Sequence, residues 1–383
     1  MSPSAFSLSP APLEGHRFGM KVFRGTLETL DGKALRAFLL DQEADLAIIR
    51  TPGDGQTVAT QFERAGFPFL HADVLVYYEM DLTTFEPKSL RNPGLEFVLC
   101  GKSLQPELSK LVETIFSGYR NHYNANPFLP ADRILEGFQE WAVEYGSGEV
   151  PDRCAWLVRR DGQWVAFATC SEAGNTCEGV LYGVHPDHAG GGLYSDLIRF
   201  TQAHYKAKGL STMKVSTQIH NLAVQKVWSR EGFTLSQCLH TWHVNSMLTY
   251  TQRPVVEQEF LVDDAAIQAY GQASGDFNPI HFDDGAAMKL GLPGRIAHGL
   301  LATGWISKVL GMEFPGPGTL FQGYRYLFLA PMFPSHTYHL RLSTLHVDRR
   351  GAWKCLGKIT DQDGTTVLLA YLDLMLRASA AQD

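Results

Sequence analysis

Residues Ser274–His281 (SGDFNPIH) and Ile296–Gly299 (IAHG) hold the densest group of chemically active side chains in this chain. Asp276 and His281 are five residues apart with Asn-Pro turning the chain between them, a spacing that can aim both side chains at one point. Together they could hold and deprotonate a water molecule, because a carboxylate raises the basicity of a neighbouring imidazole. Gly299 begins an expected helix, so its N–H could stabilise an oxyanion that develops on a carbonyl group. The pattern predicts an active site.

A glycine-rich loop forms a second candidate site. It comes between an expected strand that ends at Val184 and an expected helix that begins at Tyr194. Gly190, Gly191 and Gly192 would let main-chain N–H groups and the positive end of the helix approach a phosphate. Three glycines in a row also fit a tight turn without a ligand. From these residues alone, an anion site and a bare turn both stay open.

Length and composition limit what these sites can belong to. The chain has 383 residues, above the roughly 250–300 residues at which single cores stop growing, so we expect two or three domains. Hydrophobic residues make up 45% and charged residues 19%, as is ordinary for a folded protein. The net charge of −7, with no long run of Lys and Arg, argues against nucleic acid as a partner.

The cysteines and the apolar runs bear on metal content and compartment. The six cysteines form no Cys-x-x-Cys pair, so we expect no metal site and no disulfide framework. Residues 1–16 are rich in Ser and Pro and lack a basic start, which predicts an unstructured lead-in rather than a secretory signal. No apolar run approaches the ~18 residues of a spanning helix. We therefore expect a soluble cytoplasmic protein without a membrane partner.

A weak internal repeat organises the first two thirds of the chain. Residues 62–67 (FERAGF) are echoed by residues 228–233 (WSREGF), and a β-rich stretch follows each copy. A helix ended by a glycine in the left-handed conformation and followed by a strand explains both copies, although this arrangement also arises by chance. The repeat favours two related α/β halves, residues 1–94 and 95–246.

The last third of the chain has a different pattern. Residues 247–257 show little periodicity and are expected to form a linker. In residues 258–378, a long helix at roughly residues 300–312 precedes several extended stretches, as in a helix packed against an antiparallel sheet. The expected fold class is a multidomain protein that mixes α/β and α+β architecture.

The glycine loop in this setting resembles the cofactor loop of the GNAT superfamily of acyl-CoA-dependent N-acyltransferases. Asn221, Trp228 and the Gly-Phe pair that follows resemble a second stretch of that family, and the resemblance covers about residues 95–245. It implies a CoA thioester as cosubstrate and no tightly bound cofactor. It further implies a cofactor site in which the main chain of one strand holds pantetheine and the loop receives pyrophosphate. The residues of this site are Tyr182 and Val184 for pantetheine, Gly190, Gly191 and Gly192 in the loop, and Asn221.

The chain departs from the GNAT pattern at three positions. Ala189 stands where the family usually has Arg or Gln, and Tyr194 where it has Gly or Ala. Trp228 holds the position at which many members carry a tyrosine that protonates the leaving thiolate, and an indole N–H is not a useful acid. The proton source is therefore open, and Glu178 and His185 are candidate bases against ordinary surface roles.

Residues 119–128 (YRNHYNANPF) follow the first helix of the second half, where GNAT enzymes place residues that bind the acceptor. With its two halves, the chain looks most like the sugar-nucleotide N-acyltransferases that modify the amine of a dTDP-linked aminodideoxyhexose. His122, Tyr123 and Asn124 would offer aromatic faces and amide groups to a sugar ring and a thymine. A loop that caps itself by local hydrogen bonds is the other interpretation.

The motif of Asp276 and His281 resembles that of the MaoC-like, (R)-specific enoyl-CoA hydratases, whose hot dog fold wraps an antiparallel sheet around a long helix. By position, Asp276 and His281 become the pair that activates water, and Gly299 the donor to the thioester oxygen. A turn with a structural histidine, or a degenerate domain kept for dimerisation, would also fit. Hot dog folds usually pair through their sheets, so we expect a homodimer. The resemblance covers residues 257–376 and includes Ser274, Gly275, Asp276, Asn278, Pro279, His281, Ala297, His298 and Gly299.

Both resemblances involve CoA thioesters, which predicts a bifunctional enzyme. The C-terminal domain would hydrate a short enoyl-CoA, crotonyl-CoA above all, to the (R)-3-hydroxyacyl-CoA. The GNAT portion would then transfer that acyl group to the amino group of a dTDP-linked aminosugar. Two alternatives remain: a sugar N-acetyltransferase whose hot dog domain only dimerises, and an enoyl-CoA hydratase whose GNAT domain only binds acyl-CoA.

Overall fold

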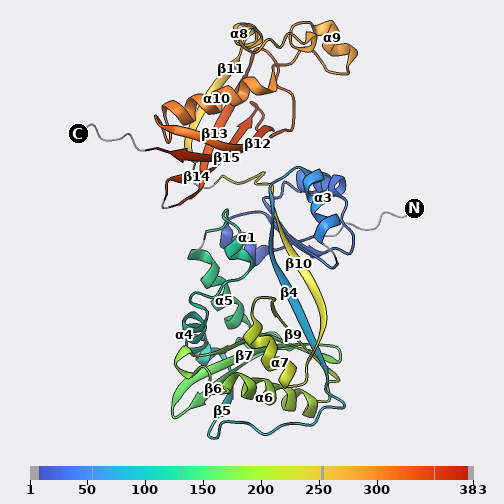
Figure 1. Ribbon diagram of the computed structural model, residues 1–383, viewed down its shortest axis with the longest axis vertical. Helices are drawn as coiled ribbons and strands as arrows, with labels where there is room; N and C mark the ends of the chain where they lie inside the picture. Colours follow the sequence, from blue (N-terminus) through green and yellow to red (C-terminus); the bar gives the residue numbers. More distant parts are fainter. Residues whose placement is uncertain (1–7, 54, 131, 252–253, 349, 378–383) are drawn as a thin grey trace, which may run out of the picture.

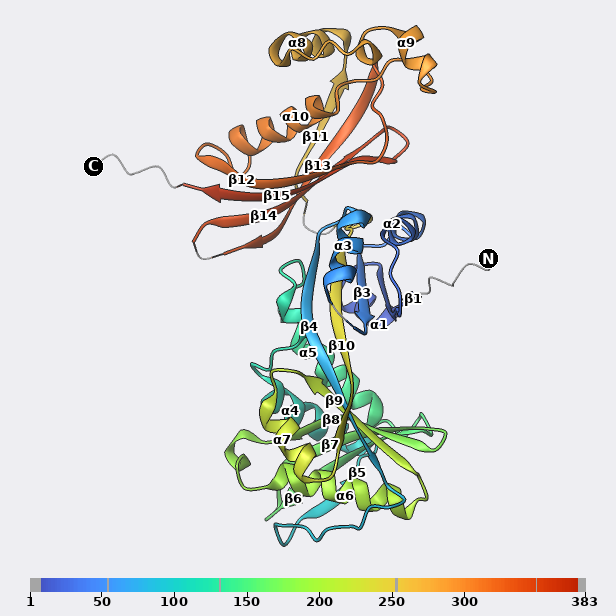
Figure 2. The ribbon, with the colours of Figure 1, turned by 45° about the vertical axis from the view of Figure 1, so that its right-hand side comes forward.

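The computed structural model describes residues 8–53, 55–130, 132–251, 254–348 and 350–377. The molecule is elongated, with a ten-stranded sheet along most of its length and a five-stranded sheet at one end (Figures 1 and 2). Among the described residues, no helix is long and apolar enough to cross a membrane. The expected mixture of α/β and α+β architecture is confirmed.

The ten-stranded sheet is formed by residues as far as Asn245. In spatial order its strands are β1 (Ser9–Pro10), β2 (Val22–Thr26), β3 (Leu46–Thr51), β10 (Thr234–Asn245), β4 (Phe69–Asp81), β9 (Thr212–Gln218), β8 (Thr176–Val184), β7 (Gln163–Ala173), β6 (Arg153–Arg160) and β5 (Glu96–Leu99). The helices between these strands are α1 (Pro12–Phe18), α2 (Gly32–Asp41), α3 (Gly55–Ala65), α4 (Gln105–Phe116), α5 (Asp132–Tyr145), α6 (Leu193–Ala207) and α7 (Leu222–Arg230). Short 3-10 turns are η1 (Lys102–Leu104), η2 (His122–Ala125) and η3 (Pro186–His188).

The repeated helix–Gly–Phe–strand pattern is present in both expected places. Helix α3 leads through Gly66 into β4, and α7 leads through Gly232 into β10. Both glycines have positive φ angles, +85° and +98°, which residues with a side chain rarely adopt. The prediction of two such copies from the sequence is confirmed.

The two halves exchange their last strands. Strand β10 of the second half pairs antiparallel with β3 of the first half, and β4 of the first half pairs antiparallel with β9 of the second. Strands β4 and β10 also pair with each other, and they appear as two long neighbouring ribbons in Figures 1 and 2. One continuous sheet therefore runs through both halves, and the domain boundaries expected from the sequence stay a prediction.

The N-terminal segment is more ordered than its composition indicated. Residues 9–10 form β1, which pairs antiparallel with β2, and α1 begins at Pro12. Leu8 and Ala11 are buried in the main core. The expectation of an unstructured lead-in is wrong for residues 8–16 because these apolar side chains have a core to enter. Residues 1–7 lie outside the described part of the chain.

The last third of the chain forms a long helix packed on a five-stranded antiparallel sheet, as expected for a hot dog fold. Helix α10 (Gly299–Met312) buries Ala302, Ile306, Val309 and Leu310 in the core of this unit. The strands, in spatial order, are β11 (Pro254–Val262), β13 (His336–Val347), β14 (Ala352–Thr360), β15 (Thr366–Leu376) and β12 (Thr319–Phe328). The remaining elements are α8 (Asp264–Ser274), η4 (Pro279–His281) and α9 (Asp284–Lys289). Strand β11 begins at Pro254, inside the range expected for the linker.

The five-stranded sheet contacts the segment that follows β10 and the turn between α3 and β4. The Tyr371 hydroxyl donates to the carbonyl oxygen of Ser246 at 2.8 Å, and the Lys358 ammonium group donates to the carbonyl oxygen of Leu248. Arg325 of β12 donates to the carbonyl oxygens of Gly66 and Phe67, at 3.3 Å each. The repeat's helix-terminating turn is thus also a docking point for the C-terminal unit.

Candidate functional sites

Strands β8 and β9 separate part-way along their length. Their parallel pairing runs from Thr176 with Thr212 to Gly179 with Val215 and ends there, whereas β8 continues to Val184 in contact with β7. Main-chain groups on one side of β8 are therefore free to bind an extended ligand, since a strand edge that is not paired offers N–H and C=O groups.

Tyr182 and Val184 lie on this part of β8, and both line a cavity of about 1510 Å³. The Tyr182 hydroxyl donates to Thr201 at 3.0 Å and contacts the Cys170 sulfur at 3.4 Å. Because its phenol is engaged on the α6 side, Tyr182 can offer a ligand only its main chain. This is the use that the sequence predicted for it.

The glycine loop closes one end of the cavity. Gly190 and Gly192 have φ angles of +81° and +87°, and Gly192 caps α6 without a side-chain hydrogen bond. The first N–H groups of a helix lack partners within the helix, so they are available to an anion. Gly191 lies between the two and also lines the cavity. The loop has the geometry that phosphate binding requires.

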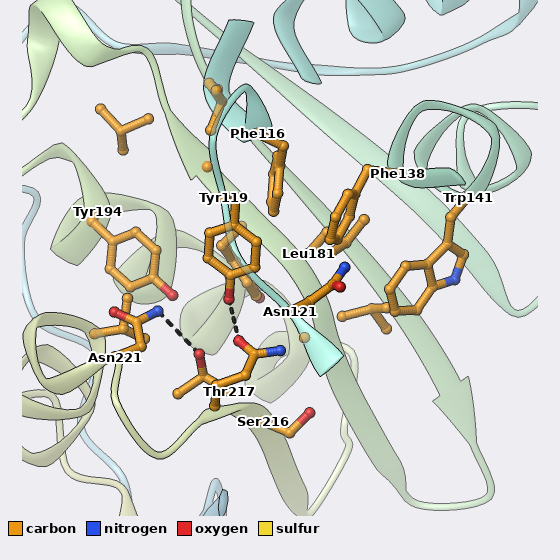
Figure 3. Close-up of a pocket in the computed structure, with 18 of the residues that line it drawn as sticks. Phe116, Tyr119, Asn121, Phe138, Trp141, Leu181, Tyr194, Ser216, Thr217 and Asn221 are labelled. Atoms are coloured by element: carbon orange, nitrogen blue, oxygen red, sulfur yellow. Dashed lines mark hydrogen bonds between the residues drawn. The ribbon is translucent and has the colours of Figure 1, made fainter. Parts of the chain in front are cut away.

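Asn221 lies at the N-terminal end of α7 on the cavity wall. Its side-chain amide donates to the Thr217 hydroxyl at 3.0 Å. Figure 3 shows this pair beside the phenols of Tyr119 and Tyr194. Tyr119 donates to the side-chain oxygen of Gln218.

The other end of the cavity is built by the first half and by η2. His122 and Tyr123 line it, as expected for acceptor-binding residues. Asn124 is not in the described wall: its side-chain oxygen accepts a hydrogen bond from the Asn121 main chain at 2.8 Å and caps η2. Asn121 lines the cavity instead. The interpretation of a self-capping loop therefore holds for the Asn124 side chain and for the Tyr123 main chain, whereas the side chains of His122 and Tyr123 line the cavity.

Of the two candidate bases, only Glu178 lies on the cavity wall. Burial raises the pKa of its carboxyl above the ordinary glutamate range, and the charges of Arg50 and Lys214 oppose this shift. A carboxylate with a raised pKa is better matched to proton abstraction near neutral pH. The Nδ1 atom of His185 accepts a hydrogen bond from the Asp187 main chain at 3.3 Å, and His185 is not in the described wall.

In the C-terminal unit, η4 brings Asp276 and His281 together. His281 donates from Nδ1 to the carbonyl oxygen of Ile296 at 2.8 Å, because a carbonyl can only accept. A neutral His281 therefore has its lone pair on Nε2. The Asp276 carboxylate accepts from the Asn278 main chain at 3.1 Å, which fixes one of its oxygens. Asp276 is exposed and His281 is buried, so water can reach the pair from one side.

His298 completes a compact group with these two residues. The rings of His281 and His298 have centroids 3.9 Å apart. Asp276, His281 and His298 place one potential ligand atom each within 4.8 Å of one another, a set that could hold a divalent cation. The sequence placed His298 in the same group of motifs, but it did not predict that the three side chains meet at one point.

Gly299 is the first residue of α10, directly after the cap residue His298. A Cβ atom at Gly299 would lie 2.7 Å from the ring of Phe328, so a larger residue would require that ring to move. Only glycine fits here without moving the Phe328 ring. The first N–H groups of an α-helix also lack partners within the helix. These are the features expected of an oxyanion donor.

Two family profiles match separate parts of the chain. The profile described as "Acetyltransferase (GNAT) family" matches residues 113–233, and the profile described as "MaoC like domain" matches residues 247–361. The first range includes the β8–β9 split and the glycine loop, and the second includes Asp276, His281 and Gly299. The chain joins a GNAT domain to a MaoC-like domain. Both families consist of enzymes.

Two curated relatives support the MaoC-like assignment. The 3-hydroxybutyryl-CoA dehydratase of Methylorubrum extorquens is 37% identical over 71 residues, which cover 18% of this chain and 45% of the relative. The (R)-specific enoyl-CoA hydratase of Rhodospirillum rubrum is 37% identical over 71 residues, which cover 18% of this chain and 49% of the relative. The chain therefore spans less than half the length of each.

One solved structure extends over much of the GNAT portion. The GCN5-related N-acetyltransferase from Sphaerobacter thermophilus is 14% identical, covers 55% of this chain and 68% of its own, and gives a TM-score of 0.38. A likeness of this size carries no argument about function.

Two tyrosines of the GNAT domain, which the sequence did not predict as site residues, have phenols near the cavity. Trp228, at the position of the usual tyrosine, is buried on the cavity wall. Tyr119 and Tyr194 line the same cavity, and burial raises the pKa of both phenols. Figure 3 shows their hydroxyl groups pointing toward the Thr217–Asn221 pair. A phenol with a raised pKa stays protonated and can donate a hydrogen bond to a leaving thiolate, although the same shift makes it a weaker acid.

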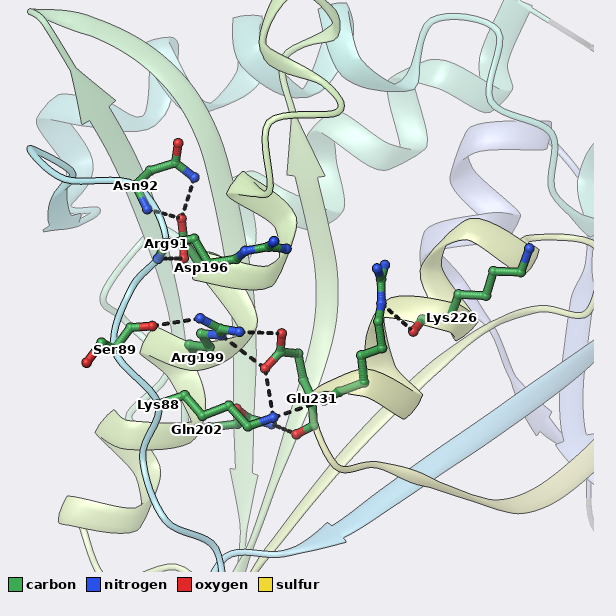
Figure 4. A network of polar contacts seen from close by, with 10 residues as sticks. Lys88, Ser89, Arg91, Asn92, Asp196, Arg199, Gln202, Lys226 and Glu231 are labelled. Atoms are coloured by element: carbon green, nitrogen blue, oxygen red, sulfur yellow. Dashed lines mark hydrogen bonds and ion pairs between the residues drawn. The ribbon is translucent and has the colours of Figure 1, made fainter.

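An arginine side chain from another segment also lies beside the glycine loop of the GNAT domain. Arg91 belongs to the segment between β4 and β5, and its side chain lies 3.4 Å from the Cβ position of Gly192. The buried Asp196 accepts from the Arg91 main chain at 2.6 Å and from the Asn92 amide at 2.7 Å (Figure 4). Asn92 also donates to the Gly191 carbonyl oxygen at 3.0 Å. These contacts hold a guanidinium at a loop that has Ala189 where the family usually has a cationic or amide side chain.

Proposed function

We propose that the protein is a bifunctional enzyme of CoA thioesters, which hydrates a short enoyl-CoA and transfers the resulting 3-hydroxyacyl group to an amine. The proposed acceptor is the amino group of a dTDP-linked aminodideoxy sugar, and crotonyl-CoA is the proposed first substrate. The C-terminal site would supply the donor that the GNAT site consumes.

The observation that carries the proposal for transfer is the extent of the GNAT cavity. Its volume of about 1510 Å³ exceeds the ~300–1,000 Å³ typical of a site for one small ligand. It runs from Gly190 and Gly192 to Glu178 and on to residues of the first half such as Arg50. A CoA thioester and a separate acceptor can therefore share it, and Glu178 lies on the same wall.

Transfer follows from the groups on this wall. Glu178 takes a proton from the acceptor amine as its nitrogen attacks the thioester carbonyl, and the C–S bond then breaks. Tyr194 supplies the proton that the leaving thiolate takes up, and the proton held by Glu178 then passes through solvent to restore the Tyr194 phenol. The products are the amide and free CoA. Proton transfers of this kind contribute roughly 10²–10⁴-fold each to an enzymatic rate.

Hydration is assigned to the C-terminal site. The free Nε2 of His281, with Asp276, takes a proton from water as its oxygen adds to C3 of the enoyl group, and the pair returns a proton to C2. The Gly299 N–H stabilises the negative charge that develops on the thioester oxygen. No cofactor is consumed.

Incubation with crotonyl-CoA tests the hydration step. Loss of the enoyl absorbance together with a mass gain of one water is expected. Recovery of intact crotonyl-CoA would exclude this step.

A donor screen with a set of dTDP-aminosugars tests the coupling of the two sites. We expect faster amide formation from 3-hydroxybutanoyl-CoA than from acetyl-CoA. Equal use of both donors would favour a plain N-acetyltransferase, and no amide from either would favour a hydratase whose GNAT domain only binds acyl-CoA.

We also propose a homodimer formed through the hot dog sheet. Strand β12 is an edge strand, and Leu320, Phe321, Tyr324 and Phe328 are exposed on it. Exposed apolar groups of this density on a sheet edge favour association. Light scattering on the purified protein should give twice the mass of one chain, and a mass equal to one chain would exclude the dimer. The proposed compartment is the cytoplasm, in keeping with six free cysteines.

A further inference from the structure

Arg50 presents an unpaired guanidinium to the cavity. It lies on β3 in the first half, and its NH1 donates to the Tyr77 hydroxyl at a long 3.4 Å. Its Nε is buried without a hydrogen-bond partner, and among the described residues no carboxylate lies within ion-pair distance of it. Arg50 is half-buried, and a buried N–H donor such as its Nε, left without a partner, favours an acceptor group from a ligand.

Two other arginines of the cavity wall each form an ion pair, which Arg50 does not do among the described residues. Arg24 pairs with Glu14 at 2.7 Å, and Arg17 pairs with Glu140 at 3.0 Å. Their charges are largely balanced within the protein. Of Arg17, Arg24 and Arg50, Arg50 is the one without an ion pair among the described residues.

A chain of buried hydrogen bonds fixes a second donor nearby. The main-chain N–H of Phe128 donates to Asn126 Oδ1, which sets the orientation of the Asn126 amide. Asn126 Nδ2 then donates to His243 Nδ1 at 3.1 Å. A neutral His243 must carry its proton on Nε2, and this N–H donates to His122 Nδ1 at 2.8 Å.

His122 is consequently a neutral imidazole with its proton on Nε2. Burial lowers the pKa of both histidines, that of His243 to about 3. The positive charges of Arg50 and Arg24 further lower the pKa of His122. No described residue accepts a hydrogen bond from His122 Nε2, and the ring lines the cavity. His122 can thus offer an N–H donor to a ligand, but it cannot serve as a base at Nδ1.

The strand register places these two donors on one face of the sheet. Arg50 pairs with Thr241 and Ile48 with His243 across β3 and β10. Since side chains two residues apart share a face and paired residues share it too, Arg50 and His243 project to the same side. His122 contacts His243 on that side.

We propose that the first-half end of the cavity is an anion subsite, in which Arg50 and His122 bind a phosphate group of the acceptor. This inference rests on the proposed acyl transfer, and it narrows the acceptor to amines that carry a phosphate or diphosphate, with the amine toward Glu178. The first half of the tandem thereby supplies acceptor recognition, while the second half binds the CoA thioester.

Calorimetric titration tests the subsite with dTDP as the probe, added to the full-length protein that is already saturated with CoA. Bound CoA occupies the glycine loop, so dTDP has to bind elsewhere. We expect Arg50→Gln to weaken dTDP binding by about tenfold or more, as loss of a charge-assisted hydrogen bond does. Arg50→Lys should lose less because it keeps the charge.

Arg159→Gln is the matched control, since Arg159 pairs with Glu96 on β5 and β6 outside the described cavity wall. It should bind dTDP as the unaltered protein does. Unchanged CoA binding in all three variants will show that they are folded. Equal dTDP affinity in Arg50→Gln and the unaltered protein overturns the proposal, as does thymidine binding as tightly as dTDP. Displacement of dTDP by acetate more readily than by inorganic pyrophosphate overturns the assignment to phosphate.

Different results would contradict the anion subsite and the proposed acyl transfer. Arg50-dependent dTDP binding without any amide formation would leave the subsite standing and remove the transfer. Amide formation on a dTDP-aminosugar with the same acceptor KM in Arg50→Gln would leave the transfer standing and remove the subsite.

Discussion

The Nε2 atom of His298 lies 3.0 Å from the main-chain carbonyl oxygen of Asp276. Because a carbonyl only accepts, His298 donates this hydrogen bond, and the imidazole is 98% buried, with 2% exposure. The bond ties the residue before α10 to the loop that carries the Asp276 carboxylate. The oxyanion donor and the water-binding pair are thus held in one geometry by a residue outside the first motif.

Replacement of His298 by Phe should therefore slow hydration, because the Asp276 loop is no longer held against the start of α10. The variant keeps the ring packing and loses the donor, which leaves the Asp276 carbonyl unpaired and should lower the free energy of unfolding by about 1–3 kcal/mol. Crotonyl-CoA hydration should lose kcat, while acyl transfer from preformed 3-hydroxybutanoyl-CoA stays unchanged. His298→Gln can place an amide N–H near the lost donor and should restore part of kcat. If the Gln and Phe variants show the same kcat for hydration, the hydrogen bond from His298 does not position the site.

Asp276→Asn separates the two proposed activities. The amide keeps the shape of the side chain but removes the carboxylate, so hydration should fall by about 10²–10⁴-fold, the range for loss of a general base. Transfer of a preformed 3-hydroxybutanoyl group should continue at the original rate. Parallel assays of enoyl absorbance and amide mass on the same preparation measure both. Simultaneous loss of the two activities would contradict independent sites.

Glu178 should give the transfer rate a distinctive pH dependence. A base must be deprotonated to act, and burial raises the pKa of Glu178, so kcat/KM for the acceptor should rise with pH through a value above the ordinary glutamate range. Glu178→Gln should lose this limb of the profile and most of the rate. A pH profile of the Gln variant that still shows the same limb would assign it to another group.

The same shift has a consequence for stability. A carboxyl whose pKa is raised in the folded state makes no difference below its unfolded pKa, and it costs stability as pH rises through the folded value. Relative to the unaltered protein, Glu178→Gln should therefore gain in free energy of unfolding between acidic and neutral pH. Urea unfolding at several pH values measures this difference, and a difference independent of pH would contradict the raised pKa.

Tyr194→Phe tests the proposed proton source. Without the phenol, the leaving thiolate has no positioned acid, and kcat for transfer should fall by about 10²-fold with little change in the KM for acyl-CoA. Tyr205→Phe is the control, since Tyr205 is a buried phenol that contacts the Cys154 sulfur outside the described cavity wall. A more acidic leaving thiol needs less help from an acid, so a donor thioester of such a thiol should reduce the difference in kcat between Tyr194→Phe and the unaltered enzyme. An unchanged difference would argue against acid catalysis by this residue.

Arg91→Gln tests the cation recruited to the glycine loop. The KM for acyl-CoA should rise by about tenfold, because a guanidinium–phosphate contact is lost. Acyl-pantetheine lacks the pyrophosphate, so its KM should not change. Arg133→Gln, which removes an exposed arginine paired with Glu136, should leave both values as they were. An equal rise with both donors would indicate a structural effect on the loop.

Several parts of the site could be predicted because they depend on neighbours in sequence. Asp276 and His281 meet because the η4 turn, with Pro279 at its start, reverses the chain between them. Gly66 and Gly232 end their helices through a local backbone conformation. In each case the residues that decide the geometry lie within a few positions of one another.

Other parts depend on partners that are distant along the chain. The buried Asp196 brings Arg91 to the glycine loop, and the pairing of β3 with β10 brings Arg50 near the His122–His243 pair. Asn124 was expected on the acceptor wall, but its side chain instead accepts a hydrogen bond from the Asn121 main chain and caps η2.

The sequence by itself determined the Asp276–His281 pair and the glycine loop, and these motifs carried the resemblance to two domain families. Short-range turns and helix caps specify both motifs without reference to the rest of the chain. Only the tertiary structure decided that the halves exchange β4 and β10, that Arg50 has no ion pair within the described part of the chain, and that Tyr194 lines the cavity. These outcomes depend on which distant groups are buried together and which are left without a partner, and that balance is set by packing of the whole fold.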